Sequence, residues 1–119
     1  MGKRSEHDEQ VSIFDWAAVK QVEIPELRLL FAIPNGGLRN KVTASKLKAE
    51  GVKSGVPDMF LPVARGRFHG LFIELKKVGG RKATDNQHEW MTRLTDQGYD
   101  CYVCYGAEPA ILTITSYLN

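Results

Sequence analysis

Three charged residues stand on two segments that otherwise have the composition of buried β-strands. Asp58 opens the segment DMFLPV, and Glu74 and Lys76 lie near the end of GLFIELK. Charged groups on buried strands are costly unless they are paired with an opposite charge or bound to a metal ion. The chemistry available to these three residues is therefore the first question that the sequence raises.

Strand geometry predicts that the three charges meet. Successive side chains of a strand point to opposite faces, so Glu74 and Lys76 would share one face while the leucines and the isoleucine take the other. A turn containing Gly66 would join the two segments as a hairpin and bring Asp58 beside Glu74. Two carboxylates and one ammonium group would then converge at the end of a strand.

The spacing alone leaves two interpretations open. The first is a structural ion pair at a sheet edge, between Lys76 and either Glu74 or Asp58. The second is a magnesium site, because Mg²⁺ binds through one or two carboxylates and keeps several water molecules that can face a phosphate substrate. In that case Lys76 would orient the attacking water, help to deprotonate it and stabilise the developing negative charge.

The elements that position these residues follow from caps, periodicity and turn signals. Ser5 and Asp8 form a capping-box pattern, and Thr84 is a second N-cap candidate. Helices are expected over residues 5–21, 40–50 and 84–97, with a short turn or helix from Pro25 and a final helix from about Pro109 to about Leu118. Strands are expected over residues 29–33, 58–63, 70–76 and 99–105.

This order of elements predicts the fold class. Helices and strands alternate, with one pair of consecutive strands, which is typical of an α/β or α+β protein whose mixed β-sheet is flanked by helices. In the first helix, Val11, Phe14, Ala18 and Val22 recur at helical spacing. We find no repeat and no linker, and expect a single domain over residues 1–119.

The composition suits a soluble globular chain and decides little about function. The 119 residues are 43% hydrophobic and 25% charged, with a formal net charge of only +2, too small to indicate nucleic-acid binding by itself. No apolar run approaches the length of a membrane span, and the N-terminus lacks the apolar region of a secretory signal. We therefore expect an intracellular protein with reduced thiols.

Cys101 and Cys104 form a C-x-x-C pattern, which occurs in zinc and redox sites. They lie in an alternating segment that predicts a strand, where residues three apart point to opposite faces, and no second C-x-x-C completes a zinc site. Our interpretation is that both are structural. We likewise expect His7, His69 and His88 at the surface rather than in a metal site.

Several ordered segments carry a resemblance to a known family. Pro57-Asp58 followed by Glu74-Leu75-Lys76 is similar to the motif of the PD-(D/E)XK nuclease superfamily. The series IPNGG, a basic helix, GVKSGVPDMFLP, GLFIELKK and TDNQHEW resembles the VRR-NUC (virus-type replication-repair nuclease) branch in particular. The resemblance extends from Glu6 to Tyr105 and implies the PD-(D/E)XK nuclease core.

The resemblance also implies roles for individual residues. Asp58 and Glu74 would be metal ligands, and the backbone carbonyl of Leu75 would complete the set. Lys76 would be the catalytic lysine. Gln87, on the helix that follows, would support Lys76 or the phosphate.

Family members carry one more acidic residue on the first helix, near the metal. Glu9 is our choice for that metal-binding and catalytic position, because it shares the inward face with Ile13 and Trp16. Glu6 and Asp8 remain alternatives.

Positive charge gathers on both sides of the motif. Contacts of this kind with phosphate give DNA affinity that is independent of sequence and falls with salt. Asn35 belongs to the same group of candidates, since the Asn-Gly-Gly segment allows a close backbone approach to a phosphate or simply turns the chain. The candidate DNA-binding residues are Asn35, Arg39, Lys41, Lys46, Lys53, Lys77, Arg81 and Lys82.

The function that this resemblance implies is a Mg²⁺-dependent DNA endonuclease, with Mn²⁺ able to substitute. Stand-alone relatives are similar to Holliday-junction resolvases, so we expect branched DNA as the substrate and a homodimer, because symmetric cutting of two strands needs two active sites. Two alternatives stay open: a less selective or flap-directed nuclease working with a replication or repair partner, and a non-catalytic DNA-binding module. We expect a cytoplasmic location in a bacterial or phage-infected cell and no membrane association.

Overall fold

The computed structural model of the chain describes residues 3–34 and 41–119, without the side chains at positions 41 and 42. Its sheet has four strands in the order β1 (Phe31–Ala32), β2 (Met59–Leu61), β3 (Leu71–Lys76) and β4 (Asp100–Tyr105). The pairs β1–β2 and β2–β3 are antiparallel, and β3–β4 is parallel. The predicted mixed sheet is confirmed, with β3 at its centre.

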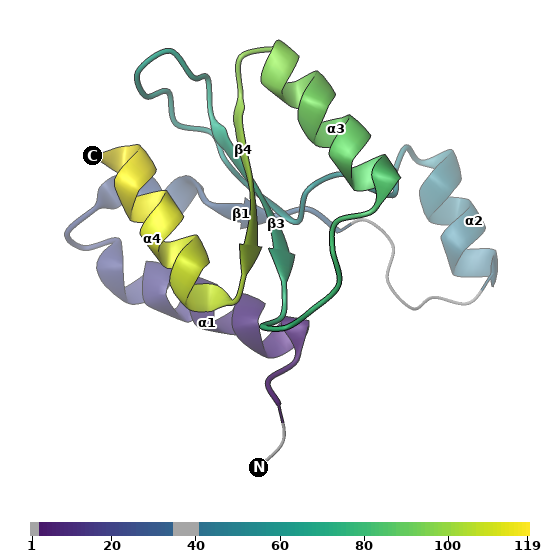
Figure 1. The fold of residues 1–119 in the computed structure, drawn as a ribbon, viewed down its shortest axis with the longest axis horizontal. Coiled ribbons are helices and arrows are strands. Elements are labelled where there is room, and N and C mark those ends of the chain that lie inside the picture. The colour runs from purple at the N-terminus through teal and green to yellow at the C-terminus, as the bar shows by residue number, and fades with distance from the viewer. Residues whose placement is uncertain (1–2, 35–40) are drawn as a thin grey trace.

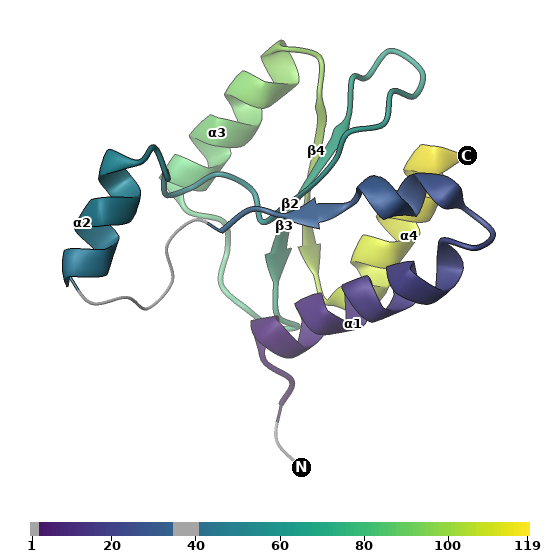
Figure 2. The ribbon, with the colours of Figure 1, turned by 180° about the vertical axis from the view of Figure 1, so that it is seen from behind.

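The helices cover both faces of this sheet. They are α1 (Glu6–Lys20), the 3-10 helix η1 (Pro25–Leu29), α2 (Lys41–Ala49), α3 (Asp85–Asp96) and α4 (Ala107–Leu118). Figures 1 and 2 show α1 and α4 together on one side of β3 and β4, α3 on the other side, and α2 standing apart beyond α3. No helix in the described segments is both long and apolar enough to span a bilayer.

Apolar packing on both faces of β3 makes it a rigid base for the charges at its end. On one face, Ile73 and Leu75 are almost fully buried against Ile13 of α1 and Ile114 of α4. On the other face, Phe72 stacks on Phe60 of β2, with ring centroids 4.2 Å apart. A strand held in this way fixes the positions of its last residues, because close-packed interiors allow little displacement.

Two helix starts form as their sequences predict. Ser5 and Asp8 make a complete capping box at the start of α1, and Thr84 and Gln87 make another at the start of α3. In the second box the Gln87 side chain accepts a hydrogen bond from the Thr84 amide. Each box satisfies amide groups that a helix N-terminus otherwise leaves without partners.

The strand predicted over residues 29–33 is present, but it is shorter than expected and is not buried. Only Phe31 and Ala32 form β1, and both are exposed, because β1 is an edge strand that pairs with β2 alone. Leu30 is buried, whereas Leu29 is 51% exposed. A short run of apolar residues could not show that Leu29 ends the 3-10 helix η1 and that the strand begins only at Phe31.

The apolar residues that predicted the first helix do not mark its inner face, and Val22 lies beyond the end of α1. Val11 is 44% exposed and Val22 is 81% exposed, while the buried stripe consists of Glu9, Ile13 and Ala17 at spacings of four residues. That stripe contains a charged residue, so a search for apolar periodicity alone passes over it.

Cys101 and Cys104 lie on β4 as free thiols, and Cys104 is buried with its sulfur 3.6 Å from the Thr113 hydroxyl. Burial is the main cause that raises the pKa of both thiols. Neutral buried thiols are poor nucleophiles and poor metal ligands, which agrees with the predicted structural role.

Glu9 links α1 to the start of α4. Its Oε1 atom accepts a hydrogen bond from the Ala107 amide at 2.9 Å, and Arg4 donates to its Oε2 atom at 3.0 Å. The N-cap of α4 is Gly106, which has no side chain to accept from the helix. The buried carboxylate of Glu9 therefore supplies the cap from a distant part of the chain and places negative charge at a helix N-terminus.

Replacing Glu9 should therefore destabilise the fold. Glu9→Ala leaves a buried amide at the start of α4 without a partner, and we expect the free energy of unfolding to fall by about 1–3 kcal/mol. Glu9→Gln keeps an acceptor oxygen and should lose less. Urea denaturation measures both, with Asp15→Ala, an exposed change on the same helix, as the control. An unchanged free energy of unfolding for Glu9→Ala would contradict this role.

Candidate active site

The register of β2 and β3 brings Asp58 to Glu74. Met59 pairs with Ile73, so the residue before β2 lies beside the residue after Ile73. The Leu75 amide donates a 2.7 Å hydrogen bond to the Asp58 carboxylate, and the Ile33 amide donates to the Asp58 carbonyl at 2.7 Å. Asp58 is thus held through both its side chain and its backbone, as the hairpin geometry predicts.

Gln87 connects the two charged residues at the end of β3. Its Nε2 atom donates to Glu74 Oε2 at 3.0 Å, and its Oε1 atom accepts from Lys76 Nζ at 3.0 Å. Lys76 and Glu74 also form an ion pair at 3.5 Å. Because the Thr84 amide holds the same Gln87 oxygen, the orientation of the amide is fixed, and the lysine and the glutamate are fixed with it.

The two carboxylates form an electrostatically unfavourable pair in the absence of a cation. Burial raises the pKa of Glu74 to about 8, the negative charge of Asp58 adds to this effect, and Lys76 opposes it. The pKa of Asp58 is also raised, chiefly by burial, against the hydrogen bond from the Leu75 amide. Two carboxyl groups so close together share a proton more readily than they ionise together.

One oxygen of this pair has no partner. Glu74 is 2% exposed, and its Oε1 atom is buried without a hydrogen bond from the described residues. A buried carboxylate oxygen costs free energy unless a donor or a cation satisfies it. A proton shared with Asp58, or a cation bound by both carboxylates, would satisfy this oxygen.

Glu6, in the first turn of α1, interacts electrostatically with this pair. The pKa of Glu6 is raised by partial burial and then by the negative charge of Asp58, while Lys76 lowers it. Figures 1 and 2 show the first turn of α1 next to the end of β3. Both oxygens of Glu9 are occupied by Ala107 and Arg4.

The assignment of Glu9 to the metal stays a prediction, and Glu6, an alternative from the sequence, becomes a second candidate. Glu9 lies on the inner face of α1, as expected, and its carboxylate contacts the start of α4, where the Gly106 amide donates to the Lys76 carbonyl. Glu6 and Glu9 lie three residues apart on neighbouring turns, so helical periodicity could not separate them. The third alternative, Asp8, uses its carboxylate in the capping box with Ser5.

The donor groups of the site fit a hard divalent cation. Within the described part of the chain, no three His, Cys, Asp or Glu side chains stand close enough together to form a metal cage of their own. Two adjacent carboxylates with one unsatisfied oxygen suit Mg²⁺, which uses few protein ligands and keeps its water molecules. The Leu75 amide is used by Asp58; ligation by the Leu75 carbonyl stays a prediction.

The candidate DNA-binding residues fall into two described groups. Lys77, Arg81 and Lys82 are exposed on the connection from β3 to α3, and Lys46 and Lys53 are exposed on α2 and the segment after it. Figure 1 shows this connection and α2 on the same side of the strands. Asn35, Arg39 and the side chain of Lys41 lie outside the described residues.

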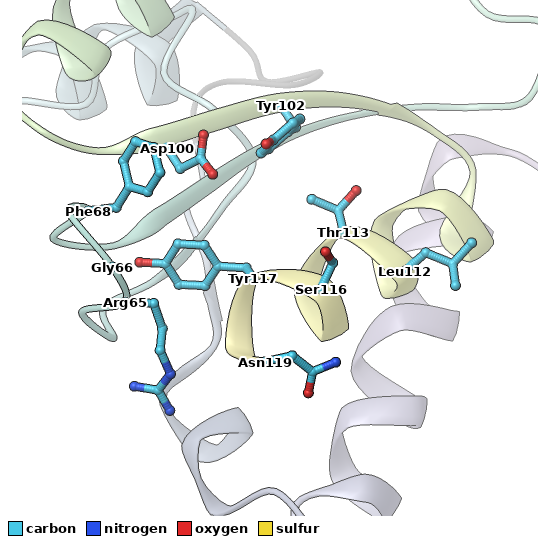
Figure 3. A pocket seen from close by; sticks show the side chains of 10 residues that line it. All are labelled: Arg65, Gly66, Phe68, Asp100, Tyr102, Leu112, Thr113, Ser116, Tyr117 and Asn119. Carbon is cyan, nitrogen blue, oxygen red and sulfur yellow. The ribbon is translucent and has the colours of Figure 1, made fainter.

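A hollow of about 530 Å³ lies away from these groups. It is bordered by the hairpin, the first half of β4 and α4, as Figure 3 shows, and includes Asp100 and Tyr102. Asp100 pairs with Leu71, at the opposite end of β3 from Lys76. Tyr117 donates to the Val63 carbonyl at 2.6 Å, so this region ties the hairpin to α4. It contributes none of the residues of the candidate site.

Comparisons with known proteins agree with this geometry. The family model described as "VRR-NUC domain" matches residues 3–108. A solved structure described as "VRR_NUC domain protein" is 31% identical in sequence and superposes with a TM-score of 0.83, covering 98% of this chain and 90% of that one. A search among curated proteins found no match. With a match over most of its length, a shared fold and the PD…ExK residues assembled at one end of β3, the chain belongs to the VRR-NUC family of PD-(D/E)XK nucleases.

Proposed function

We propose that this nuclease domain is a Mg²⁺-dependent DNA endonuclease whose catalytic centre is formed by Asp58, Glu74 and Lys76. The observation that supports the proposal most directly is the buried Glu74 oxygen without a partner, beside a second carboxylate. Family membership supports nuclease chemistry. The choice of Mg²⁺ follows from the ligand types, and Mn²⁺, which accepts the same oxygen ligands, should substitute.

Each residue then has a defined task. Asp58 and Glu74 would hold the cation, and Glu6, in the first turn of α1, would add negative charge in their neighbourhood. The bound cation would supply Lewis-acid polarisation of the phosphate and charge stabilisation during hydrolysis. Lys76 lies with its ammonium group fixed by Gln87, from where it orients the attacking water and stabilises negative charge on the phosphate.

Branched DNA is the substrate class that we propose for this centre. The two basic groups, on the β3–α3 connection and around α2, can contact backbone phosphates in a manner that is independent of base sequence. A homodimer with two-fold symmetry would provide one centre for each of two paired strands. A less selective or flap-directed nuclease that works with a repair partner is the alternative within the same chemistry.

Glu74→Gln should abolish cleavage while keeping the fold. The amide retains the size of the side chain but loses the charge that holds the cation, and we expect a loss of at least about a hundredfold in rate. Cleavage of labelled DNA in Mg²⁺ measures the rate, and DNA affinity in Ca²⁺ tests whether binding persists. Glu89→Gln, an exposed change on α3, is the matched control. Wild-type rates for Glu74→Gln would exclude the proposed centre.

Glu6 and Glu9 should show opposite effects. Glu6→Gln should reduce the cleavage rate about tenfold to a hundredfold with little change in unfolding free energy, because the Glu6 side chain is largely exposed and its charge interacts with that of Asp58. Glu9→Gln should lower stability and keep most of the rate below its melting temperature. Rates measured well below that temperature separate the two. A large loss of cleavage rate in Glu9→Gln, with little loss in Glu6→Gln, would instead support Glu9 as the metal ligand.

Metal-free protein should lose stability as pH rises. The folded pKa of Glu74 is about 8, against an ordinary value of 4.5, so its contribution is greatest below about pH 4.5 and is lost as pH rises through 8. Wild-type protein in EDTA should thus be less stable at pH 9 than at pH 6. Glu74→Gln should show a smaller decline, and Mg²⁺ should restore wild-type stability at pH 9. Urea titrations measure the free energy of unfolding at each pH. An equal fall from pH 6 to pH 9 in the wild type and in Glu74→Gln would contradict the role of Glu74.

The substrate proposal requires its own comparison. We expect faster cleavage of a four-way junction than of a flap or a linear duplex of the same sequence, with loss of the difference at high salt as phosphate contacts weaken. Initial rates at fixed protein concentration, with solution mass measured at that concentration, test both selectivity and dimerisation. Equal rates on all three substrates would favour the less selective nuclease.

A further inference from the structure

Two consecutive residues of α3 hold the two halves of the candidate site. Gln87 binds Glu74 and Lys76 at the end of β3. Asn86 binds the segment that leads into Asp58: its Nδ2 atom donates to the Ser54 carbonyl at 3.0 Å and lies 3.3 Å from the Ser54 hydroxyl. The first turn of one helix therefore contacts the chain on both sides of the carboxylate pair.

The packing of Gly55 shows independently how closely this segment lies against α3. Gly55 has φ +90°, a conformation that residues with a side chain rarely adopt. A Cβ atom at this position would stand 2.4 Å from Asn86 Nδ2 and 3.0 Å from Trp90 Cδ1. The backbone of Gly55 is thus packed directly against two residues of α3, and not merely connected through one hydrogen bond.

The path from this contact to Asp58 is short and constrained. Pro57 is almost fully buried and fixes its own φ angle. At the far end, the Ile33 amide holds the Asp58 carbonyl and the Leu75 amide holds the Asp58 carboxylate. Residues 54–58 are therefore anchored at both ends, with Asn86 providing the anchor on the side away from the sheet.

We propose that Asn86 is a positioning residue for metal binding, fixing residues 54–58 so that the Asp58 carboxylate lies beside Glu74 before a cation arrives. This inference rests on the proposed function of the site. Two like charges repel, so the arrangement needs support from the surrounding structure. If the Asn86 contact already orders residues 54–58, a cation does not have to order them when it binds. The affinity of the site for the cation is then higher.

Two variants of Asn86 and two controls test the proposal. Asn86→Ala removes the anchor, and Asn86→Asp keeps its size but replaces the donor with an acceptor that faces the Ser54 carbonyl. Ser54→Ala removes only the hydroxyl and keeps the carbonyl that accepts the 3.0 Å hydrogen bond. Thr92→Ala changes an exposed residue of the same helix.

Mn²⁺ binding, measured by calorimetry with the metal alone, is the first readout. Both Asn86 variants should bind Mn²⁺ about tenfold more weakly, while Ser54→Ala and Thr92→Ala should match the wild type. Hydrogen exchange in metal-free protein should accelerate in a peptide covering residues 52–58 for the Asn86 variants alone. Excess Mg²⁺ should restore cleavage by the Asn86 variants. It would not restore cleavage if the variants had lost activity because they were unfolded.

The results distinguish the positioning role from the proposed function. Wild-type Mn²⁺ affinity and unchanged exchange in a folded Asn86→Asp protein would overturn the role of Asn86 while leaving the site intact. A lower melting temperature without a change in Mn²⁺ affinity would reduce Asn86 to a structural residue. Failure of the wild-type protein to bind Mn²⁺ at all would overturn the metal site itself.

Discussion

The proximity of two carboxylates, one buried and one half-buried, is the constraint on which the rest of the structure depends. Asp58 and Glu74 stand side by side, and burial raises the pKa of both. Such a pair is unfavourable unless a cation or a proton is present. Its persistence requires that neighbouring elements hold each carboxylate, and most of the hydrogen bonds around the end of β3 do so.

The support comes from three directions. The antiparallel register supplies the Leu75 amide to Asp58, α3 supplies Gln87 to Glu74 and Lys76, and the packed faces of β3 prevent the strand from yielding. The rest of the fold serves these contacts. Capping of α3 is part of the arrangement, because the Gln87 side chain that closes the capping box also joins the charged residues. One side chain thus stabilises a helix end and orders the site.

Two acidic residues of α1, Glu6 and Glu9, have different roles. Glu9 is buried and caps α4, which fixes α1 to the rest of the protein. Glu6 lies one turn earlier, where it senses the charges of Asp58 and Lys76. The same residue type therefore contributes a hydrogen bond to the fold in one position and negative charge near the site in the other.

The sequence by itself predicted that Asp58, Glu74 and Lys76 come together, and it predicted the class of fold. Strand alternation and a short hairpin suffice to bring Asp58 to Glu74, since the pairing is local and the side-chain period is two residues. Family membership likewise followed from the order of short segments. The Ser5–Asp8 capping box and the Thr84 N-cap involve residues at most three apart, and both formed as predicted.

Only the tertiary structure decided what the carboxylate of Glu9 contacts and how the segment before Asp58 is held. Glu9 contacts an amide 98 positions away, and Asn86 contacts a carbonyl 32 positions away. Neither contact has a local pattern, because both depend on how whole helices pack on the sheet. Periodicity identifies the inner face of a helix, but the element that this face meets is set by the packing of the complete chain.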